Sequence, residues 1–378
     1  MKFFATTVKG LEDIAAREVR NLLNCNVKLG FGKIFFESDS EAIFKLNMLS
    51  RTIHKVSLLL CHRNFSTLKD IYDIAKNIDY TEFIASDQSF AIRAERVGVH
   101  DFTSMDVAAT VGQAVIDGDR EAENIRWKVN LDEPDVEILC LVKENEFLMG
   151  LNTTGESLHR RGYRIYDHPA ALKTTIASSM VLMADWNPKK LLLDPFCGGG
   201  TILIEAAQIA RNIPPGLFRW ENFAFKKLKF LDYNEFEDLR LKCMCNIIDN
   251  IYPIWGLEKF SKHLNGALIN ALSGGVLDTL NLICGDATKL EEYLSFTPEL
   301  IITNPPYGVR MKPRRIRILY SRFLKSLKRI ASGSKLIIIT AAKRKFSEAA
   351  EEVGIEIISK RVVFHGNLET AIFNCIIP

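Results

Sequence analysis

The sequence lacks the spacing of cysteines and histidines that marks a zinc site. Eight cysteines are scattered through 378 residues, and Cys243 and Cys245 are the only close pair. No second pair of Cys or His stands at ligand spacing, so we expect no bound metal. Cysteines without a paired framework are typical of a reducing compartment.

Long apolar runs are also absent. No run reaches the roughly 20 residues that span a membrane, and the first residues, Met1 to Ala5, lack the apolar core of a secretory signal. We therefore expect a cytoplasmic protein with no membrane partner. The net charge of +3 is too small to indicate a partner by itself.

Acidic residues are missing from one long segment. No Asp or Glu occurs between Leu300 and Ser347, whereas Lys and Arg accumulate there. Such a run favours a surface for a polyanion, although a solvated helix face would have the same composition. Our candidate contacts are the cations that follow Asn304 most closely: Arg310, Lys312, Arg314 and Arg315.

What the sequence does contain is a glycine-rich turn between an apolar strand and a helix. Leu191 to Asp194 predict the strand, and the helix begins near Thr201. Three glycines between them let the backbone turn sharply and pass close to a ligand. A Walker lysine and a Gly-x-Gly-x-x-Gly spacing are both missing, which argues against a phosphate loop and a dinucleotide loop. Cys197 lies in this turn without an activating His or Lys nearby, so we interpret it as a small turn residue.

The amino-terminal half shows no chemical constellation. Residues 1–60 follow the order strand, helix, hairpin, helix, strand, which predicts a ferredoxin-like α+β unit. A second small unit of strands and helices follows in residues 61–154, and both units are typical of binding modules. Residues 155–185 form a basic linker and a connecting helix, and residues 186–378 form the last domain.

That last domain alternates strands with helices, apart from an insertion at residues 213–250, and closes with an antiparallel pair of strands. The pattern predicts an α/β, doubly wound sheet, which binds ligands at the carboxyl ends of its strands. Asp194, Glu258 and Asp286 each end a predicted strand. Glu258 suits a ribose diol and Asp286 an adenine amino group, so we expect S-adenosylmethionine as the cofactor.

A fourth strand ends in the segment Asn304, Pro305, Pro306, Tyr307. The prolines hold the chain extended. The Asn304 side chain and the Pro305 carbonyl can then accept hydrogen bonds from one exocyclic amino group and aim its lone pair at a methyl donor. Tyr307 offers a face on which a flipped base can stack. A structural Pro-Pro turn is the alternative interpretation.

Several segments of the first half resemble a THUMP domain. These are Phe90–Arg96, the turn Asp132–Asp135 and the basic exit Ser157–Tyr163. The resemblance implies docking on the CCA end of tRNA, with Arg160 and Arg161 as RNA contacts.

Residues 165–378 resemble the class I S-adenosylmethionine-dependent methyltransferases that act on amino groups. The resemblance implies a Rossmann-like, seven-stranded sheet. With the THUMP-like half, the chain resembles the tRNA guanine-N2 methyltransferases that modify guanosine 6 of the acceptor stem, and we expect a monomer. The implied cofactor-binding residues are His168, Pro169, Asp194, Pro195, Phe196, Cys197, Gly198, Gly199, Gly200, Thr201, Glu258, Asp286, Ala287 and Asn304.

Other functions remain open on the sequence. The segment Ile213–Arg219 also resembles ribosomal RNA guanine-N2 methyltransferases. A guanosine-10 tRNA enzyme, a DNA amino-methyltransferase and a catalytically silent RNA-binding protein are further alternatives. We also expect that removal of residues 1–160 abolishes RNA selection without unfolding the cofactor domain.

Overall fold

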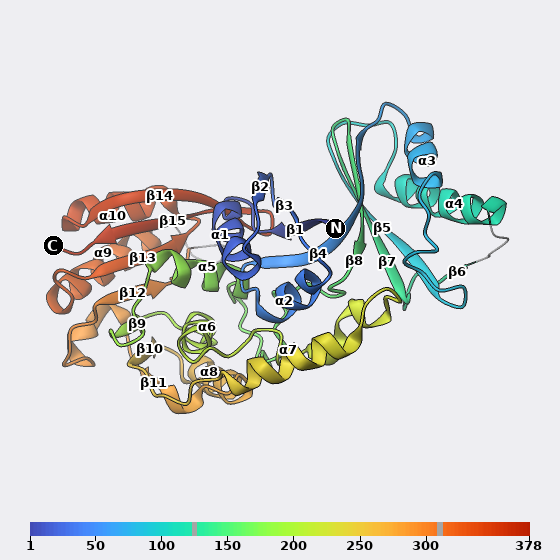
Figure 1. Ribbon diagram of the computed structural model, residues 1–378. Coiled ribbons are helices and arrows are strands. Elements are labelled where there is room, and N and C mark those ends of the chain that lie inside the picture. Colours follow the sequence, from blue (N-terminus) through green and yellow to red (C-terminus); the bar gives the residue numbers. More distant parts are fainter. Residues whose placement is uncertain (123–126, 308–312) are drawn as a thin grey trace.

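The amino-terminal half is built on one continuous eight-stranded sheet (Figure 1). The computed structural model describes residues 1–122, 127–307 and 313–378. The strand order is β2-β3-β1-β4-β8-β7-β5-β6. The elements of this half are β1 (Lys2–Thr7), α1 (Glu12–Leu23), β2 (Val27–Gly30), β3 (Lys33–Glu37), α2 (Glu41–Leu49), β4 (Ile53–Asn64), α3 (Leu68–Lys76), β5 (Ser89–Val97), α4 (Ser104–Ala122), β6 (Lys128–Val129), β7 (Val136–Lys143) and β8 (Glu146–Asn152).

Strand β4 belongs to both small units. Its first part pairs antiparallel with β1, and its second part pairs antiparallel with β8. The register on β8 shifts between Leu59 and Cys61. The boundary that we placed between residues 60 and 61 thus lies inside a strand, at this irregularity. The two units share a backbone ladder rather than a linker.

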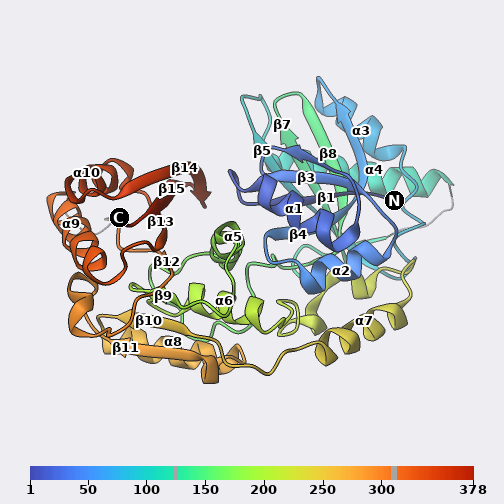
Figure 2. The same cartoon turned by 60° about the vertical axis from the view of Figure 1, so that its left-hand side comes forward.

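The second half contains a separate seven-stranded sheet (Figure 2). Its order is β11-β10-β9-β12-β13-β15-β14, with parallel pairing from β11 to β13 and an antiparallel β14–β15 hairpin at one edge. Its elements are α5 (Thr174–Ala184), β9 (Leu192–Asp194), α6 (Thr201–Ala210), η1 (Trp220–Asn222), η2 (Ala224–Lys227), α7 (Tyr233–Cys245), β10 (Ile254–Glu258), α8 (Ser261–Ser273), η3 (Leu277–Thr279), β11 (Leu280–Cys284), η4 (Ala287–Glu292), β12 (Leu300–Thr303), α9 (Pro313–Ile330), β13 (Lys335–Thr340), α10 (Lys343–Val353), β14 (Glu356–His365) and β15 (Leu368–Ile376).

Helices cover both faces of this second sheet. Neighbouring residues of a strand point to opposite faces, and in the buried strands both sets of side chains are mostly apolar. Ile302 of β12 packs in the apolar cluster of α5 and α6, whereas Ile301 packs in that of α9 and α10. The predicted doubly wound sheet with a terminal antiparallel hairpin is therefore confirmed. No helix in the described part of the chain is long and apolar enough to cross a membrane.

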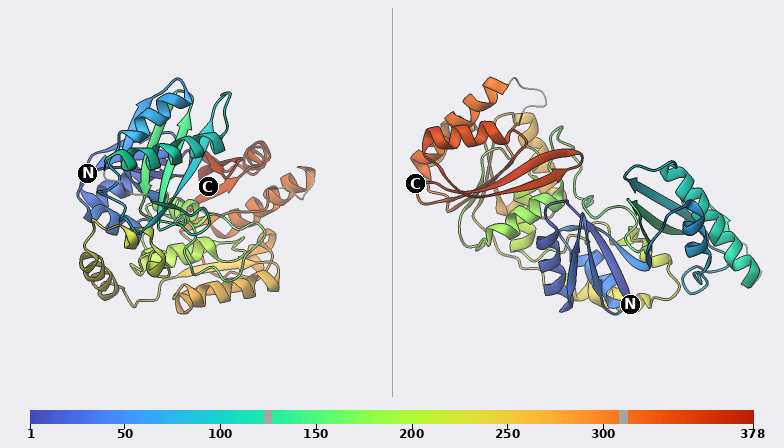
Figure 3. Two further views of the ribbon diagram at one scale, coloured as in Figure 1. Left: turned by 90° about the vertical axis from the view of Figure 1, so that its right-hand side faces the viewer. Right: turned by 90° about the horizontal axis from the view of Figure 1, so that it is seen from above.

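The insertion at residues 213–250 joins the two halves. Phe225 and Phe236 are fully buried against Phe44 of α2, with ring centroids 5.2 and 5.9 Å from it. The Phe225 amide also donates to the carbonyl of Thr153, at 2.8 Å. Seen from above, the unit with β1 and α1 lies between the methyltransferase-like half and the α3–α4 end of the molecule (Figure 3). The insertion is thus part of the amino-terminal core.

Candidate active site

The predicted site residues come together where the strand order reverses. β9 lies between β10 and β12, and both neighbours run parallel to it. Their carboxyl ends therefore meet at one edge, with Asp194 ending β9, Glu258 ending β10 and Asn304 following β12. Ligands of doubly wound sheets bind in the crevice at such a switch point.

The glycine loop folds back over the end of β10. The Cys197 amide donates to the Leu257 carbonyl at 3.1 Å, and the Gly198 amide donates to Glu258 Oε2 at 3.1 Å. Gly198 and Gly200 have φ values of +52° and +81°, in the left-handed region that favours glycine. Burial raises the pKa of the Cys197 thiol well above its usual value, so this side chain is no thiolate nucleophile.

The three acids occupy different environments. Asp194 is fully buried and accepts a hydrogen bond from the Thr303 hydroxyl at 2.7 Å, which ties β9 to β12. Burial raises the pKa of the Asp194 carboxyl to about 7, although the hydrogen bonds from the Thr303 hydroxyl and the Phe196 amide lower it. Glu258 accepts the amides of Gly198 and Phe260, one on each oxygen. Among the described residues each oxygen of Glu258 accepts only one hydrogen bond, which leaves a lone pair on each for a ligand.

Asp286, the third acid, lies at the β11 end. Its carboxylate accepts a hydrogen bond from Lys259 Nζ at 2.7 Å and another from the Thr288 amide at 2.9 Å. Although burial raises its pKa, these hydrogen bonds lower it below the ordinary value. Ala287, which follows it, is buried. Asp286 is therefore an ionised acceptor at the same edge of the sheet.

Asn304 carries an unsatisfied acceptor. Its Oδ1 atom is buried and has no hydrogen-bond partner among the described residues. Pro305 is buried, Pro306 is exposed, and Tyr307 is half-buried, which raises the pKa of its phenol. The Tyr320 hydroxyl of α9 donates to the Pro306 carbonyl at 3.1 Å and so anchors this segment. A buried acceptor without a partner costs about 1–3 kcal/mol, so its presence here points to a ligand donor.

His168 lies over the glycine loop. A Cβ on Gly198 would be 3.4 Å from the His168 ring, and a Cβ on Gly199 would be 3.3 Å from the His168 Cβ. Pro169 is exposed, and the Thr201 hydroxyl accepts a hydrogen bond from Arg164 at 3.1 Å. Of the remaining predicted cofactor residues, Phe196 packs edge-on against Phe323 of α9, at 5.0 Å, and Pro195 is buried.

One predicted RNA contact is wrong. Arg161 is 2% exposed, and its guanidinium pairs with Glu205 of α6 at 3.3 Å. It also donates to the carbonyls of Leu158 and Arg51. With its donors used inside the protein, Arg161 does not reach RNA. Arg160 beside it is exposed and pairs with Glu156 at 2.6 Å.

The basic run is largely neutralised by α10, η4 and β15. Arg317 and Lys325 pair with Glu352, Arg344 and Lys345 pair with Glu348, and Arg329 and Lys343 pair with Glu291 and Glu369. Arg315 is exposed and has no ion pair among the described residues. Arg310 and Lys312, and the side chain of Arg314, lie outside the described residues. Arg322 and Lys328 of α9 are also exposed without an ion pair among the described residues. The polyanion surface predicted from composition is therefore reduced to a few cations along α9.

Sequence reasoning missed three residues of the site: Thr303, Tyr320 and Asn270. Thr303 and Tyr320 act through Asp194 and the Pro306 carbonyl. Asn270 of α8 contacts the glycine loop with its side chain. A single sequence holds no signal for such residues, since each sits in an ordinary apolar strand or helix.

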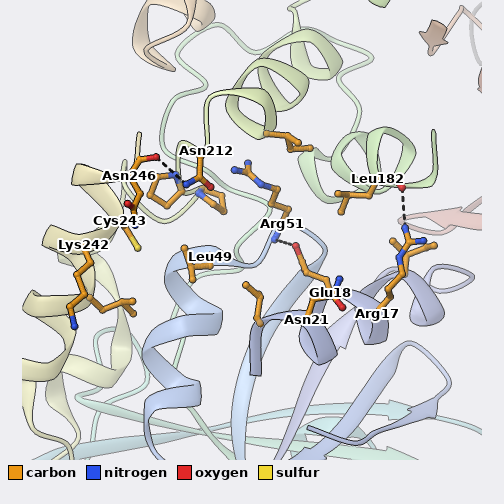
Figure 4. A pocket seen from close by; sticks show the side chains of 16 residues that line it. Arg17, Glu18, Asn21, Leu49, Arg51, Leu182, Asn212, Lys242, Cys243 and Asn246 are labelled. Carbon is orange, nitrogen blue, oxygen red and sulfur yellow. Dashed lines mark hydrogen bonds between the residues drawn. The ribbon is translucent and has the colours of Figure 1, made fainter. Parts of the chain in front are cut away.

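A cavity of about 540 Å³ lies elsewhere, where α1, α5, α7 and the end of α6 meet (Figure 4). Ile209 at the carboxyl end of α6 lines it, whereas the glycine loop precedes the amino end of that helix. Arg51 points into it from the turn before β4 (Figure 4). This cavity marks the junction of the two halves and is separate from the site at the strand ends.

Comparisons with known proteins agree with the domain pattern. A family model described as "RMKL-like, methyltransferase domain" matches residues 161–371, a THUMP domain model matches residues 65–152, and an RlmL ferredoxin-like domain model matches residues 2–57. A tRNA (guanine(6)-N2)-methyltransferase of Methanocaldococcus jannaschii is 43% identical over 380 residues, which cover 99% of this chain and 99% of that protein.

Solved structures share the whole fold. One described as a possible methylase from Clostridium difficile 630 matches 100% of this chain and 98% of its own, with a TM-score of 0.90 and 27% identity. SMU.472, solved in complex with SAH, matches 99% of this chain and 97% of its own, with a TM-score of 0.88. The sequence identity to SMU.472 is 23%, so this similarity shows a shared fold and not a shared function. The resemblance to THUMP-containing methyltransferases is thus confirmed, and the chain belongs to the RMKL-like methyltransferase family, with a ferredoxin-like domain and a THUMP domain ahead of its methyltransferase domain.

Proposed function

We propose that this chain is a tRNA guanine-N2 methyltransferase that uses S-adenosylmethionine and modifies guanosine 6 of the acceptor stem. The observation that carries the proposal is Asn304 Oδ1, a buried acceptor that has no partner among the described residues and lies at the switch point of a methyltransferase sheet. Full-length similarity to a protein named for guanosine-6 N2 methylation supports the choice of target.

The described residues fit the cofactor. Glu258 holds its two oxygens at the end of β10 with lone pairs free for a ribose diol. Asp286 offers a carboxylate for an adenine amino group, with Ala287 beside it. The loop Pro195–Thr201 and the segment His168–Pro169 enclose the place for the amino-acid end. The bound cofactor supplies an electrophilic methyl group.

Asn304 and Pro305 act on the guanine amino group. That nitrogen is a poor nucleophile, because its lone pair is shared with the ring. Acceptance of its two hydrogens by Asn304 Oδ1 and the Pro305 carbonyl returns electron density to nitrogen and aims the lone pair. The N–CH3 bond forms as the sulfur–methyl bond breaks, and the extra proton then leaves the nitrogen for water. Tyr307 supplies the stacking face for a flipped base.

The amino-terminal half supplies RNA recognition in this proposal. A THUMP domain next to the methyltransferase half supports docking of the CCA end of tRNA there. Arg160 and the cations at the start of α9 remain our candidate phosphate contacts. A cytoplasmic location and a monomeric state remain predictions.

A ribosomal RNA target is the second candidate. It is favoured by the match of residues 161–371 to an RMKL-like model and of residues 2–57 to an RlmL ferredoxin-like model. Both candidates use the same guanine amino chemistry at Asn304. The RNA class therefore separates them, not the site.

The test is methyl transfer from labelled S-adenosylmethionine to defined RNAs. We expect N2-methylguanosine at position 6 of a tRNA transcript with guanosine there, and no label in a matched transcript with adenosine at position 6. Label in a large-subunit ribosomal RNA fragment, and none in tRNA, would support the second candidate. Label at another tRNA guanosine would refute the position but keep the chemistry.

A further inference from the structure

Residues 164–168, which we call the strap, cross the glycine loop outside the sheet. Asn270 of α8 lies between the two and is 1% exposed. The sequence did not indicate a role for the Asn270 side chain. Its environment shows what it does.

The Asn270 amide makes four hydrogen bonds. Its Oδ1 accepts the amides of Ile165 and Tyr166, at 3.0 and 2.8 Å. Its Nδ2 donates to the carbonyls of Tyr166 and Gly199, both at 3.0 Å. A side-chain amide combines a two-fold acceptor with two donors, so all of its capacity is used here. Three of the four bonds hold the strap, and the fourth holds the glycine loop.

Packing fixes the strap in the same place. The Tyr166 ring lies directly over Gly266 of α8, where a Cβ would be 2.1 Å from the ring. The Tyr166 hydroxyl forms a 2.7 Å hydrogen bond with His263 Nδ1. At the other end of the strap, Arg164 bonds the Thr201 hydroxyl and the Leu172 carbonyl, at 3.1 and 2.9 Å. The strap is thus fastened to α6 and α8 and carries His168 over Gly198.

We propose that Asn270 is a positioning residue for the cofactor. It fixes the strap against Gly199, so that the part of the site formed by His168 and the glycine loop is assembled in the RNA-free protein. This inference rests on the proposed use of S-adenosylmethionine. Groups that are already in place bind a ligand without the entropic cost of ordering them. Binding of the cofactor therefore does not require RNA, and its affinity depends on Asn270 through the strap and the glycine loop.

Calorimetric titration of the RNA-free protein with S-adenosylhomocysteine tests the proposal. We expect Asn270→Ala to weaken binding about ten-fold or more, since it removes all four hydrogen bonds. Asn270→Asp keeps the acceptor for Ile165 and Tyr166 but turns an oxygen toward the Gly199 carbonyl, so it should also weaken binding. Asn265→Ala is the matched control, because Asn265 is exposed on the same helix.

Kinetics separate positioning from mere destabilisation. Asn270→Ala should raise the KM for the cofactor, and leave kcat at saturating cofactor and the KM for tRNA unchanged. A lower melting temperature with unchanged affinity for S-adenosylhomocysteine would overturn the proposal, as would equal affinities of Asn270→Ala and Asn265→Ala. Absence of binding by the unmodified protein would instead refute the proposed cofactor, so the two failures are distinguishable.

Discussion

In the proposed function, the methyl transfer depends on Asn304. Its Oδ1 has no partner within the described protein, so loss of the side chain removes an interaction made only with the substrate. We expect Asn304→Ala to lower kcat by 10²-fold or more, roughly the effect of removing one transition-state hydrogen-bonding group. The affinity for S-adenosylhomocysteine should persist. Turnover close to that of the unmodified enzyme would contradict the role of Asn304.

Asp194 makes stability depend on pH. Burial disfavours the charged carboxylate and raises its pKa from the ordinary 3.8 to about 7 in the folded protein. Between these values the folded state binds more protons than the unfolded state. The stability that Asp194 contributes is therefore complete below the lower value and is lost as pH rises through 7.

We expect Asp194→Asn to remove this slope. The melting temperature of the unmodified protein should fall, relative to that of the variant, between about pH 4 and about pH 7. Differential scanning fluorimetry of both proteins across that range measures the difference. A constant difference would show that Asp194 does not titrate there.

The sequence predicted residues that the structure brings together at one edge of the sheet, and it missed residues that hold them in place. Asp194, Glu258 and Asn304 are visible because each follows an apolar strand, and strand ends meet at one edge. Asn270 and Tyr320 contact the site from helices through backbone carbonyls. Arg161 was misassigned because a basic segment appears exposed until its partner Glu205, 44 residues later, is known.

Among the elements, α9 supports the segment after β12. Tyr320 reaches the Pro306 carbonyl and also shares a 2.8 Å hydrogen bond with the Thr340 hydroxyl of β13. We expect Tyr320→Phe to lower kcat about ten-fold by loosening Asn304. The affinity for S-adenosylhomocysteine should not change, since Glu258 and the glycine loop are untouched. Equal loss of kcat and of cofactor affinity would indicate general unfolding instead.

Helix α9 carries both cations that form ion pairs and cations that do not. Arg315 has no ion pair among the described residues, whereas Arg317 pairs with Glu352 at 3.4 Å. Arg315→Ala should weaken tRNA binding and reduce the slope of log affinity against log salt by about 1. Arg317→Ala is the matched control and should leave the slope unchanged. Identical slopes for both variants would exclude Arg315 as a phosphate contact.

Helix α10 shows why composition misled the sequence interpretation. We treated Lys343 to Lys345 as part of a basic run, but they begin a helix whose later residues include Glu348 and Glu352. These carboxylates lie within 4.0 Å of cations on α9 as well as on α10. The carboxylates lie far along the sequence from the α9 cations that they neutralise, so composition alone does not show the pairing.

For the whole molecule, a buried ion pair ties the linker to the catalytic half. Glu205 accepts hydrogen bonds from Arg161, from the Tyr163 hydroxyl at 3.0 Å and from Ser178 of α5. Removal of one partner leaves the other charge buried alone. We expect Arg161→Met to cost about 3–5 kcal/mol in free energy of unfolding. Urea denaturation measures this loss, and exposed Arg160→Met is the control that should lose little.

Contacts between the two halves lead us to expect that removal of residues 1–160 does destabilise the cofactor domain, in contrast to the expectation from the sequence. The insertion at residues 213–250 buries Phe225 and Phe236 against Phe44. Truncation would expose these rings and also delete Arg51, whose guanidinium donates to the carbonyl of Ile213 at 2.5 Å. The halves are distinct in sequence, but they share a core that no local pattern predicts.

Strand β4 fixes the ferredoxin-like unit and the THUMP unit relative to one another, because it pairs with strands of both. One strand runs through the ferredoxin-like and THUMP units, with a register shift between Leu59 and Cys61. The insertion packs against both units, through Phe44 and through Phe83. Under the proposed function, we expect units held together in this way to select a nucleotide by its distance from the end of the RNA and not by its sequence. In the proposed function, the number of base pairs between the CCA end and the target would then decide which guanosine is methylated.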